Sequence, residues 1–397
     1  MMQLQIPKRM EQFEEGIFQT LNDKILERKE KRLRVYNFSI GTPDFEPDEH
    51  VMQAVSRAAS NPENYKYSLR DLPELTSAVI ARYAIRYGVE LAEDEITGVY
   101  GSQEGIAHIA FSLIDPGDVV LVPNPGYPIF GIGPSLAGAS IRPYDLTEGK
   151  HYLPDLEDLE RRYGKGAPAA DHAKVMIVSY PLNPICKCAP DAFYEELIPW
   201  AIRNEILILH DNAYSDIIYD GRKGRSILSF PRAKEIAAEF YSLSKSFNYT
   251  GARMSFLIGD AELVHRFRKF RSQIDYGIFL PVQYGAIAAL KGSDASVYEH
   301  CREYERRRDA LCDGFTKLGW DFPRSEGTMF AWARIPEKYG TDDVRFVLEL
   351  MEQTGIVCTP GSSFGSLGAG HVRFALVHPV HVIEEALAEA KASRILE

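Results

Sequence analysis

The sequence predicts an α/β protein with a large three-layer α/β/α domain, built on a mostly parallel sheet, and a smaller α+β domain. Short runs rich in Val and Ile recur between residues 119 and 259, with the length and composition of strands buried on both faces. Amphipathic segments of helix length lie between these runs, and strands that alternate with helices form crossover units in a parallel sheet. The 397 residues also exceed the usual size of one hydrophobic core.

The first segment combines a helical pattern with VYNFSIGTPDFEPDE (35–49), whose Gly and Pro residues mark an extended crossing. We assign residues 1–47 to the smaller domain and residues 48–290 to the large one. The strands expected in the large domain are VVLV (119–122), VMIVS (175–179), ILIL (206–209) and FLIG (256–259). The helices expected between them are 103–114, 191–204 and 260–272.

The pattern of the sequence changes after about residue 290, where the regular alternation of apolar strands and helices ends. A long charged helix, SVYEHCREYERRRDALCDGFTKLG (296–319), leads into a strand, MFAWARI (329–335), and a helix near 342–353. The segments GIVCTPG and HVRFALV and a closing helix follow. We therefore assign residues 291–397 to the small domain of mixed strands and helices.

Composition excludes several classes of protein. A net charge of -11 argues against a sequence-independent nucleic-acid binder, which needs a concentrated basic surface. Five scattered cysteines form no disulfide framework, and the Cys186/Cys188 pair has no second Cys or His pair nearby for zinc. The amino terminus lacks the apolar stretch of a signal peptide, and no apolar run approaches the ~18 residues that span a bilayer. We expect a cytoplasmic protein without metal, membrane or nucleic-acid partners.

Two glycine-rich stretches only partly match nucleotide-binding loops. In GIGPSLAG (131–138) the third glycine falls two places late and no strand precedes it, which disfavours a nicotinamide-dependent dehydrogenase. GSSFGSLGAG (361–370) lacks the lysine followed by Ser or Thr of a Walker loop. We interpret both as tight or mobile loops.

Polar stretches follow the predicted strands, where a parallel sheet places its functional residues. YGSQEGIAH (100–108) opens a helix with a small turn, so the amides of Ser102, Gln103 and Glu104 can hold a phosphate. SYPLNPIC (179–186) ends a strand with Asn183, whose amide can donate to a phenolic oxygen or a carbonyl. A turn-forming Asn before proline would look the same.

The next two strands end in an acid and a lysine. ILILHDNAYSDI (206–217) places Asp211 at a strand end and Tyr214 three residues later. Buried carboxylates are rare unless paired, so Asp211 faces a cation or a hydrogen-bond network, or forms a structural salt bridge. Lys245 follows the strand EFYSLS (239–244), where removal from water and nearby positive groups favour the neutral, nucleophilic amine.

Together these features describe a pyridoxal phosphate site. Such a site needs a lysine that bonds to an aldehyde, an acid that holds a protonated pyridine nitrogen, donors to a phenolic oxygen, and a phosphate cup. Ser242, Ser244, Arg253 and the helix start at 102–104 would form the cup. The planar fork of Arg253 suits phosphate oxygens better than a lysine would.

The sequence resembles the class I and II aminotransferases of the fold-type I pyridoxal phosphate superfamily, which includes aspartate aminotransferase. The resemblance rests on motifs that occur in the family's order: SIGTPDFEP, GSQEG, NPGYP, YPLNP, HDNAY, SLSKSFNYTGAR and VRFAL. It implies a homodimer with both active sites at the subunit interface. It also implies transfer of an amino group between an amino acid and a 2-oxo acid by ping-pong kinetics.

The resemblance implies a role for individual residues. Lys245 is similar to the lysine that bonds to the cofactor and later moves a proton at the substrate's α carbon. Asp211 resembles the partner of the pyridine nitrogen, which strengthens the ring as an electron sink. Asn183 and Tyr214 match the donors to the phenolic oxygen. Tyr127, in NPGYP, resembles the aromatic residue that stacks on the ring, with core packing as the alternative.

The substrate's carboxylate has candidate partners too. Arg373, in GHVRFAL, matches the arginine that binds the α-carboxylate, a task for a planar bidentate donor, and Asn183 is expected beside it. Gly41, in SIGTPDF, resembles the residue whose backbone meets the same carboxylate, although an ordinary turn glycine would look alike. No second arginine motif identifies a dicarboxylate substrate. RSQIDYGIF (271–279) is similar to members that act on diaminopimelate or aspartate, and the substrate stays open.

The sequence departs from the family at two places. Ile185 and Cys186 follow Asn-Pro where the family often has Thr-Gly. Asp71 stands where the family commonly has glycine, which leaves both Tyr65 and Tyr67 as candidates for the tyrosine that reaches the neighbouring subunit's phosphate. We choose Tyr67. Two other functions stay open: a β-lyase on the same scaffold, and a non-catalytic pyridoxal-binding regulator, which would need a DNA-binding segment that we do not find before Gly41.

Overall fold

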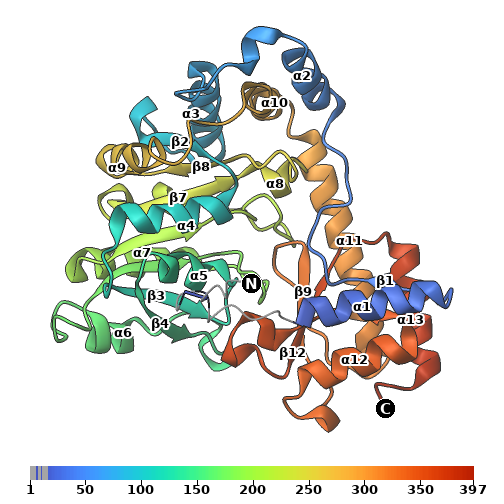
Figure 1. Ribbon diagram of the computed structural model, residues 1–397. Helices are drawn as coiled ribbons and strands as arrows, with labels where there is room; N and C mark the ends of the chain where they lie inside the picture. Colours follow the sequence, from blue (N-terminus) through green and yellow to red (C-terminus); the bar gives the residue numbers. More distant parts are fainter. Residues whose placement is uncertain (1–5, 8–9, 11–16) are drawn as a thin grey trace, which may run out of the picture.

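The computed structural model describes residues 6–7, 10 and 17–397. Its main sheet has seven strands in the order β2-β8-β7-β6-β5-β3-β4, and β8 alone runs antiparallel to its neighbours (Figure 1). The bounds are β2 (Ile96–Val99), β3 (Val119–Asn124), β4 (Ser140–Asp145), β5 (Ala173–Val178), β6 (Leu207–Asp211), β7 (Ala237–Ser242) and β8 (Ser255–Ile258). The predicted, mostly parallel sheet is confirmed.

Helices cover both faces of this sheet because alternate residues of its strands are apolar on both sides. Val120 and Val122 of β3 pack in one buried cluster, and Leu121 packs in the other. The first cluster includes α4 (Ser102–Leu113), α5 (Ile129–Leu136) and α9 (Ala261–Arg271), and the second includes α3 (Pro73–Tyr87), α7 (Asp191–Asn204) and α10 (Leu280–Lys291). Full burial of each such aliphatic side chain contributes roughly 1.5–3 kcal/mol. Two further helices, α2 (Glu49–Ala59) and α6 (Leu156–Tyr163), also belong to this part of the chain.

The carboxy-terminal part contains a three-stranded antiparallel sheet, ordered β11-β12-β9. Its strands are β9 (Phe330–Arg334), β11 (Thr359–Pro360) and β12 (His371–Ala375). The helices are α11 (Ala295–Lys317), which runs down from the region of α10 in Figure 1, α12 (Asp343–Thr354) and α13 (Val380–Ser393). This arrangement is the mixed unit that the sequence predicted.

The amino-terminal segment packs on this carboxy-terminal unit. It holds α1 (Ile17–Glu30) and β1 (Tyr36–Asn37), and β1 pairs in parallel with β10 (Ile356–Val357). Arg28 of α1 donates to the carbonyl of Glu352 at 2.8 Å. These contacts join residues within 17–37 to the carboxy-terminal unit. The assignment of residues 1–47, 48–290 and 291–397 to two domains stays a prediction.

The parallel strands β5, β6 and β7 end at the same edge of the sheet. Asn183 follows β5, Asp211 ends β6, and Lys245 lies in the short helix α8 (Leu243–Ser246) that follows β7. The topology therefore brings together three side chains that the sequence separates. None of the helices in the described part of the chain is both long and apolar enough to cross a membrane.

Candidate active site

A cavity of about 200 Å³ lies at this edge of the sheet, between the main sheet and β9 and β12. Most of the residues predicted for the site line it: Gly41, Ser102, Gln103, Tyr127, Asn183, Asp211, Tyr214, Ser242, Ser244, Lys245, Arg253 and Arg373. They come from segments up to 332 positions apart, from 41 to 373. The fold thus assembles the predicted constellation in one place.

One end of the cavity has the features of an anion site. Helix α4 begins at Ser102, and no side chain caps it because the preceding residue is Gly101, whose φ of 85° suits glycine. The guanidinium of Arg253 lies against Gly101 so closely that a Cβ there would collide with it. The Ser102 hydroxyl is buried without a partner among the described residues. Free helix amides, an arginine and an unpartnered hydroxyl together favour a phosphate group.

The serines before the lysine differ in their surroundings. The Ser242 hydroxyl accepts from the amide of Ser244 at 3.1 Å and is 2.9 Å from the Ser255 hydroxyl, so it caps helix α8. No hydrogen bond of the Ser244 hydroxyl is found in the described chain, and this residue lines the cavity. Both stay predicted cofactor ligands, and Ser242 also shapes the turn that presents Lys245.

The Lys245 amine points into the cavity and donates to the carbonyl of Gly41 at 2.7 Å. Burial, together with the positive charges of Arg373 and Arg253, lowers the pKa of Lys245 to about 8. A substantial fraction of this lysine is therefore neutral near physiological pH. Gly41 fits here because a Cβ at this position would collide with the ring of Phe330.

Asp211 is a buried carboxylate with an unused acceptor. Its side-chain oxygen Oδ1 has no hydrogen-bond partner among the described residues, and no ion pair of Asp211 is found there. Burial raises the pKa of Asp211 to about 6, although His210 and the Ala213 amide act in the opposite direction. An unpartnered buried acceptor costs free energy, so a ligand's N–H donor fits this position. Asp211 therefore does not form the structural salt bridge that the sequence left open as an alternative, at least within the described residues.

Behind Asp211 lies a fully buried polar network. The ring nitrogen Nδ1 of His210 is 2.8 Å from Glu239 Oε2, and the Tyr83 hydroxyl donates to Glu239 Oε1 at 2.6 Å. The backbone amide of Ile227 also donates to Glu239. These bonds fix the strands β6 and β7 side by side and hence the direction in which Asp211 enters the cavity.

Arg373 is a buried cation without a carboxylate partner among the described residues. Its guanidinium lies between the rings of Phe330 and Phe364, at 4.1 and 4.6 Å from their centroids. It donates to Asn183 Oδ1 at 2.9 Å, which leaves the Asn183 Nδ2 free to donate to another acceptor. Burial lowers the pKa of Arg373 to about 10. A buried guanidinium that lacks an acid is suited to bind a ligand's carboxylate.

Two tyrosines, Tyr214 and Tyr127, also line the cavity. Burial raises the pKa of Tyr214 well above its ordinary value, so its hydroxyl stays protonated and can donate. Burial also raises the pKa of Tyr127, whose hydroxyl donates to Gln103 Oε1 at 3.1 Å. Tyr127 lines the cavity, as expected for an aromatic residue that stacks on a planar ligand.

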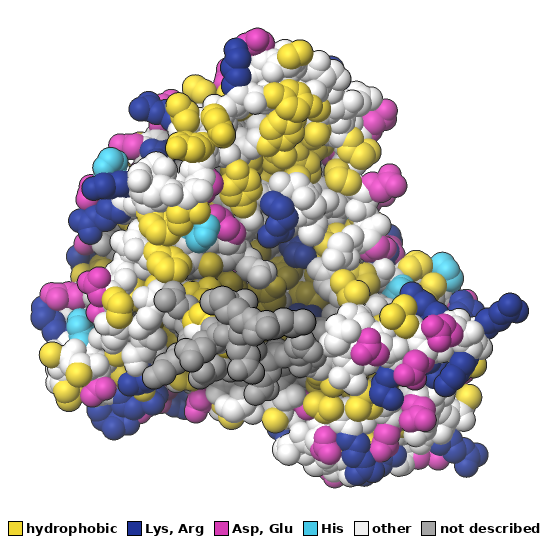
Figure 2. All heavy atoms as spheres, in the orientation of Figure 1, with side chains coloured by type: hydrophobic (Ala, Val, Ile, Leu, Met, Phe, Trp, Pro, Cys, Tyr) yellow, Lys and Arg dark blue, Asp and Glu magenta, His cyan; other side chains and the backbone are white. Residues whose placement is uncertain are grey.

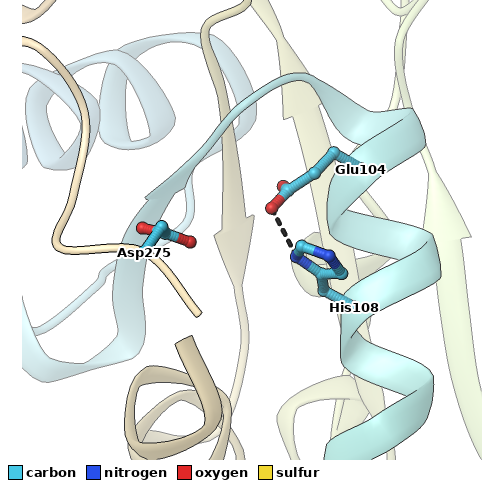
Figure 3. A group of neighbouring side chains, drawn as sticks. All are labelled: Glu104, His108 and Asp275. Atoms are coloured by element: carbon cyan, nitrogen blue, oxygen red, sulfur yellow. Dashed lines mark ion pairs between the residues drawn. The ribbon is translucent and has the colours of Figure 1, made fainter. Parts of the chain in front are cut away.

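Two predicted residues do not line the cavity. The Glu104 carboxylate accepts from the amide of Tyr100 at 3.2 Å and lies 2.5 Å from His108 Nδ1. Figure 3 shows both side chains on α4, with Asp275 facing them. The Asp275 carboxylate is itself held by Arg271 at 2.7 and 3.1 Å, so an ion-pair network accounts for this cluster. Only the backbone amide of Glu104, the group on which the prediction rested, remains for the cofactor.

Tyr67 is the second exception. Its side chain is 80% exposed, and its ring centroid lies 5.1 Å from the ring centroid of Tyr276. It is not among the residues that line the cavity of its own chain. Tyr65 is also exposed, and its hydroxyl donates to the carbonyl of Ala59. The choice between them concerns a second subunit and stays a prediction.

Sequence reasoning missed Ser179, Thr250 and Phe330, which also line the cavity. Thr250 carried a weak signal, since it lies in the polar run SKSFNYT, and its hydroxyl donates to the carbonyl of Ser244 at 2.7 Å. Phe330 carried no such signal, because a phenylalanine in an apolar strand looks like an ordinary core residue. Cys186, at the departure from the family motif, takes a left-handed conformation with φ of 65°, where a glycine would be unstrained.

Comparison with known proteins now decides the family. A family model described as "Aminotransferase class I and II" matches residues 34–389. The chain belongs to the class I and II aminotransferases. The LL-diaminopimelate aminotransferase of Dehalococcoides mccartyi (strain CBDB1) is 36% identical to this aminotransferase over 388 residues, which cover 97% of this chain and 98% of the relative. The glutamate-pyruvate aminotransferase AlaC of Escherichia coli (strain K12) is 38% identical over 361 residues, 90% of this chain and 86% of the relative.

Solved structures agree with the fold. A substrate-bound BacF structure from Bacillus subtilis superposes with a TM-score of 0.91 at 32% identity, covering 98% of both chains. A Thermus thermophilus aspartate aminotransferase mutant gives 0.90 at 24% identity, covering 98% of this chain and all of the other, which supports the fold only. The enzyme is therefore a fold-type I, pyridoxal phosphate-dependent transaminase. The unpartnered Asp211 and Ser102 oxygens and the uncapped start of α4 fit that cofactor.

Proposed function

We propose that this aminotransferase transfers an amino group from an amino acid to a 2-oxo acid by ping-pong kinetics, with Lys245 as the catalytic residue. One observation carries the proposal: a lysine of depressed pKa lies in a cavity that also holds an unpartnered acid and two arginines. Bound pyridoxal phosphate supplies an electron sink for the bonds at the substrate's α carbon. The side chains around it must then bind, orient and move protons.

Each side chain has a task that its surroundings support. Arg253, Ser242, Ser244 and the first amides of α4 bind the phosphate, and Asp211 accepts from the protonated pyridine nitrogen. Asn183 and Tyr214 donate to the phenolic oxygen, and Tyr127 covers the ring. Arg373 binds the substrate's α-carboxylate, with Asn183 beside it. Lys245 would hold the cofactor's aldehyde carbon, and its amine would take and return the proton at the substrate's α carbon.

The names of the relatives narrow the choice of substrate. LL-Diaminopimelate, glutamate and alanine are the amino donors that we propose to test first, because relatives that cover most of the chain act on diaminopimelate or on glutamate and pyruvate by name. Aspartate and aromatic amino acids complete the screen. Formation of the matching 2-oxo acid and of a new amino acid would be measured by chromatography. Release of ammonia without an acceptor would indicate a β-lyase instead.

An absorbance measurement tests the core of the proposal. The purified protein should be yellow, and its absorption should change when an amino donor is added. Lys245→Ala should abolish turnover, while the matched variant Lys223→Ala, at an exposed lysine outside the cavity, should leave it unchanged. A colourless protein that cannot be reconstituted with pyridoxal phosphate would refute the function. Substantial transamination by Lys245→Ala would refute the role of the lysine.

We further propose that the enzyme is a homodimer. Six large hydrophobic side chains, here called the aromatic patch, are exposed, and they include the two tyrosines that are candidates to reach a neighbouring subunit: Tyr65, Tyr67, Leu69, Ile274, Tyr276 and Phe279. Their exposed fractions range from 43% to 80%, an unfavourable arrangement unless something covers them. Figure 2 shows hydrophobic side chains gathered on the upper part of the molecule, around α10. A second copy of the chain would cover them and bring Tyr67 to its partner's phosphate.

The mass in solution, measured by light scattering, tests the dimer. Tyr276→Asp should lower the mass towards that of one chain, and Tyr67→Phe should keep the dimer but weaken cofactor binding. A monomeric wild-type enzyme with full activity would contradict this proposal. We also propose a cytoplasmic location, since all five cysteines of the chain are free thiols, as a reducing compartment keeps them.

A further inference from the structure

The glycine-rich stretch 361–370 lies next to Arg373, since the ring of Phe364 contacts the Arg373 guanidinium. It forms two short 3-10 turns, η8 (Gly361–Phe364) and η9 (Ser366–Gly368), between β11 and β12, and β12 carries Arg373. The facing segment is NPGYP (124–128), a loop that begins at Asn124, the last residue of β3, and contains Tyr127. Hydrogen bonds join these two loops, 124–128 and 361–370.

Asn124 makes the connection with both ends of its amide. Its Nδ2 donates to the Ser366 hydroxyl at 3.0 Å, and its Oδ1 accepts from the Leu367 amide at 3.2 Å. Asn124 is 8% exposed, so these bonds are protected from water. Gly365 has a φ of 122°, and a Cβ on it would collide with Asn124 Oδ1. The glycine is therefore required for this close approach.

The connection continues to the substrate's arginine. The amide of Gly126 donates to the carbonyl of Phe364 at 2.8 Å, and the ring of Phe364 lies 4.6 Å from the Arg373 guanidinium. The other end of the loop is tied to α12, because Ser362 donates to the buried carboxylate of Asp343 through both its amide and its hydroxyl. Phe364 is thus held between an anchor on α12 and an anchor on the loop that follows β3.

We propose that Asn124 is a positioning residue that links loop 124–128 to loop 361–370 and so holds Arg373 in the orientation that binds the substrate's carboxylate. This inference rests on the proposed function of Arg373. It assigns a role to an asparagine and a glycine-rich loop that are both absent from the residues lining the cavity. Substrate binding should depend on the link, whereas the proton transfers at Lys245 should not.

Steady-state kinetics provide the first test. Asn124→Ala removes the two bonds to loop 361–370 and a longer one, from Nδ2 to Asp145 Oδ1 at 3.5 Å. It should raise KM for the amino donor and for the 2-oxo acid roughly tenfold, with kcat changed by less than about threefold. Ser366 is exposed, so Ser366→Ala should not impair folding. This variant removes one of the bonds to Asn124 and should raise KM by a smaller factor. Adding it to Asn124→Ala should cause little further loss, since both changes break the same bond. Ser363→Ala, in the same loop but without a side-chain hydrogen bond among the described residues, is the matched control.

The second test uses cofactor-free protein and needs no turnover. Amide hydrogen exchange should become faster within residues 361–370 of Asn124→Ala and stay unchanged in α7 and α9. An unchanged KM in an active enzyme, or faster exchange spread over the whole chain, would overturn the proposal. If the wild-type protein neither binds pyridoxal phosphate nor transaminates, the proposed function fails, and the exchange measurement still decides whether Asn124 holds the two loops together.

Discussion

The depressed pKa of Lys245 gives a prediction that can be measured on the cofactor-free protein. With a pKa of about 8, roughly a quarter of the lysine is neutral at pH 7.5, whereas a lysine at the ordinary 10.5 is neutral in about one molecule per thousand. The cavity therefore raises the supply of neutral amine about 240-fold at this pH. Burial is the main cause, and the neighbouring arginines contribute.

Competitive labelling measures this pKa directly. Cofactor-free protein is treated with a small uncharged acylating reagent from pH 6 to 11, and the modified Lys245 peptide is quantified by mass spectrometry. The peptide of Lys223, an exposed lysine, serves as the internal reference for the reagent. The labelling of Lys245 should rise with a midpoint near pH 8, and the midpoint is independent of how easily the reagent enters the cavity.

A second variant tests the cause of the shift. Arg373→Gln removes a positive charge that faces the amine, so the midpoint of Lys245 labelling should move to higher pH. A midpoint at the ordinary value in the wild-type protein would refute the argument from burial. A midpoint that stays in place in Arg373→Gln would refute the contribution of the arginine.

Three further predictions concern single side chains. Arg373→Lys loses both the planar fork and the contact with two phenyl rings, so KM for the amino donor should rise on the order of 100-fold while the absorbance of the bound cofactor stays the same. Asp211 has a folded pKa of about 6 and an ordinary value of 3.8, so its contribution to stability is present below pH 3.8 and is lost as pH rises through 6. This loss is about 3 kcal/mol in denaturant titrations of the cofactor-free protein, and Asp211→Asn should abolish that pH dependence. Gly101→Ala places a methyl group against the Arg253 guanidinium and strains a residue with φ of 85°, so the dissociation constant for pyridoxal phosphate, measured by fluorescence, should rise at least about tenfold; equal affinity would contradict the proposed phosphate site.

The order of strands and helices could be predicted because burial on both faces leaves a clear composition. The expected runs VVLV, VMIV and ILIL in β3, β5 and β6 consist of Val, Ile, Leu and Met alone. Strand β7, expected from EFYSLS, is equally buried but more mixed in composition. The direction of β8 could not be predicted, because an antiparallel strand that is buried on both faces has the same composition as a parallel one.

The site was predictable where its residues carry chemistry in their own side chains. Asp211, Lys245 and Arg373 are rare types for buried positions, so their place after strands was informative. Phe330 and Phe364 look like ordinary core residues in the sequence, and their function comes only from their distance to the Arg373 guanidinium. The role of loop 361–370 was hidden for the same reason, since Asn124 lies more than 230 positions before it in the chain.

The unequal number of cations and acids in the cavity has a consequence for how ligands arrive. Three basic side chains, Lys245, Arg253 and Arg373, line it, and Asp211 is the acid among its lining residues, in a protein whose net charge is -11. Doubly charged phosphates and carboxylates are thus repelled at long range and attracted near the entrance, where low-dielectric walls concentrate the local field. Added salt should screen the repulsion at a distance before it weakens the attraction inside. Small inorganic anions should occupy the same positive groups, so the choice of buffer anion, more than ionic strength itself, should govern how quickly the enzyme captures its substrate.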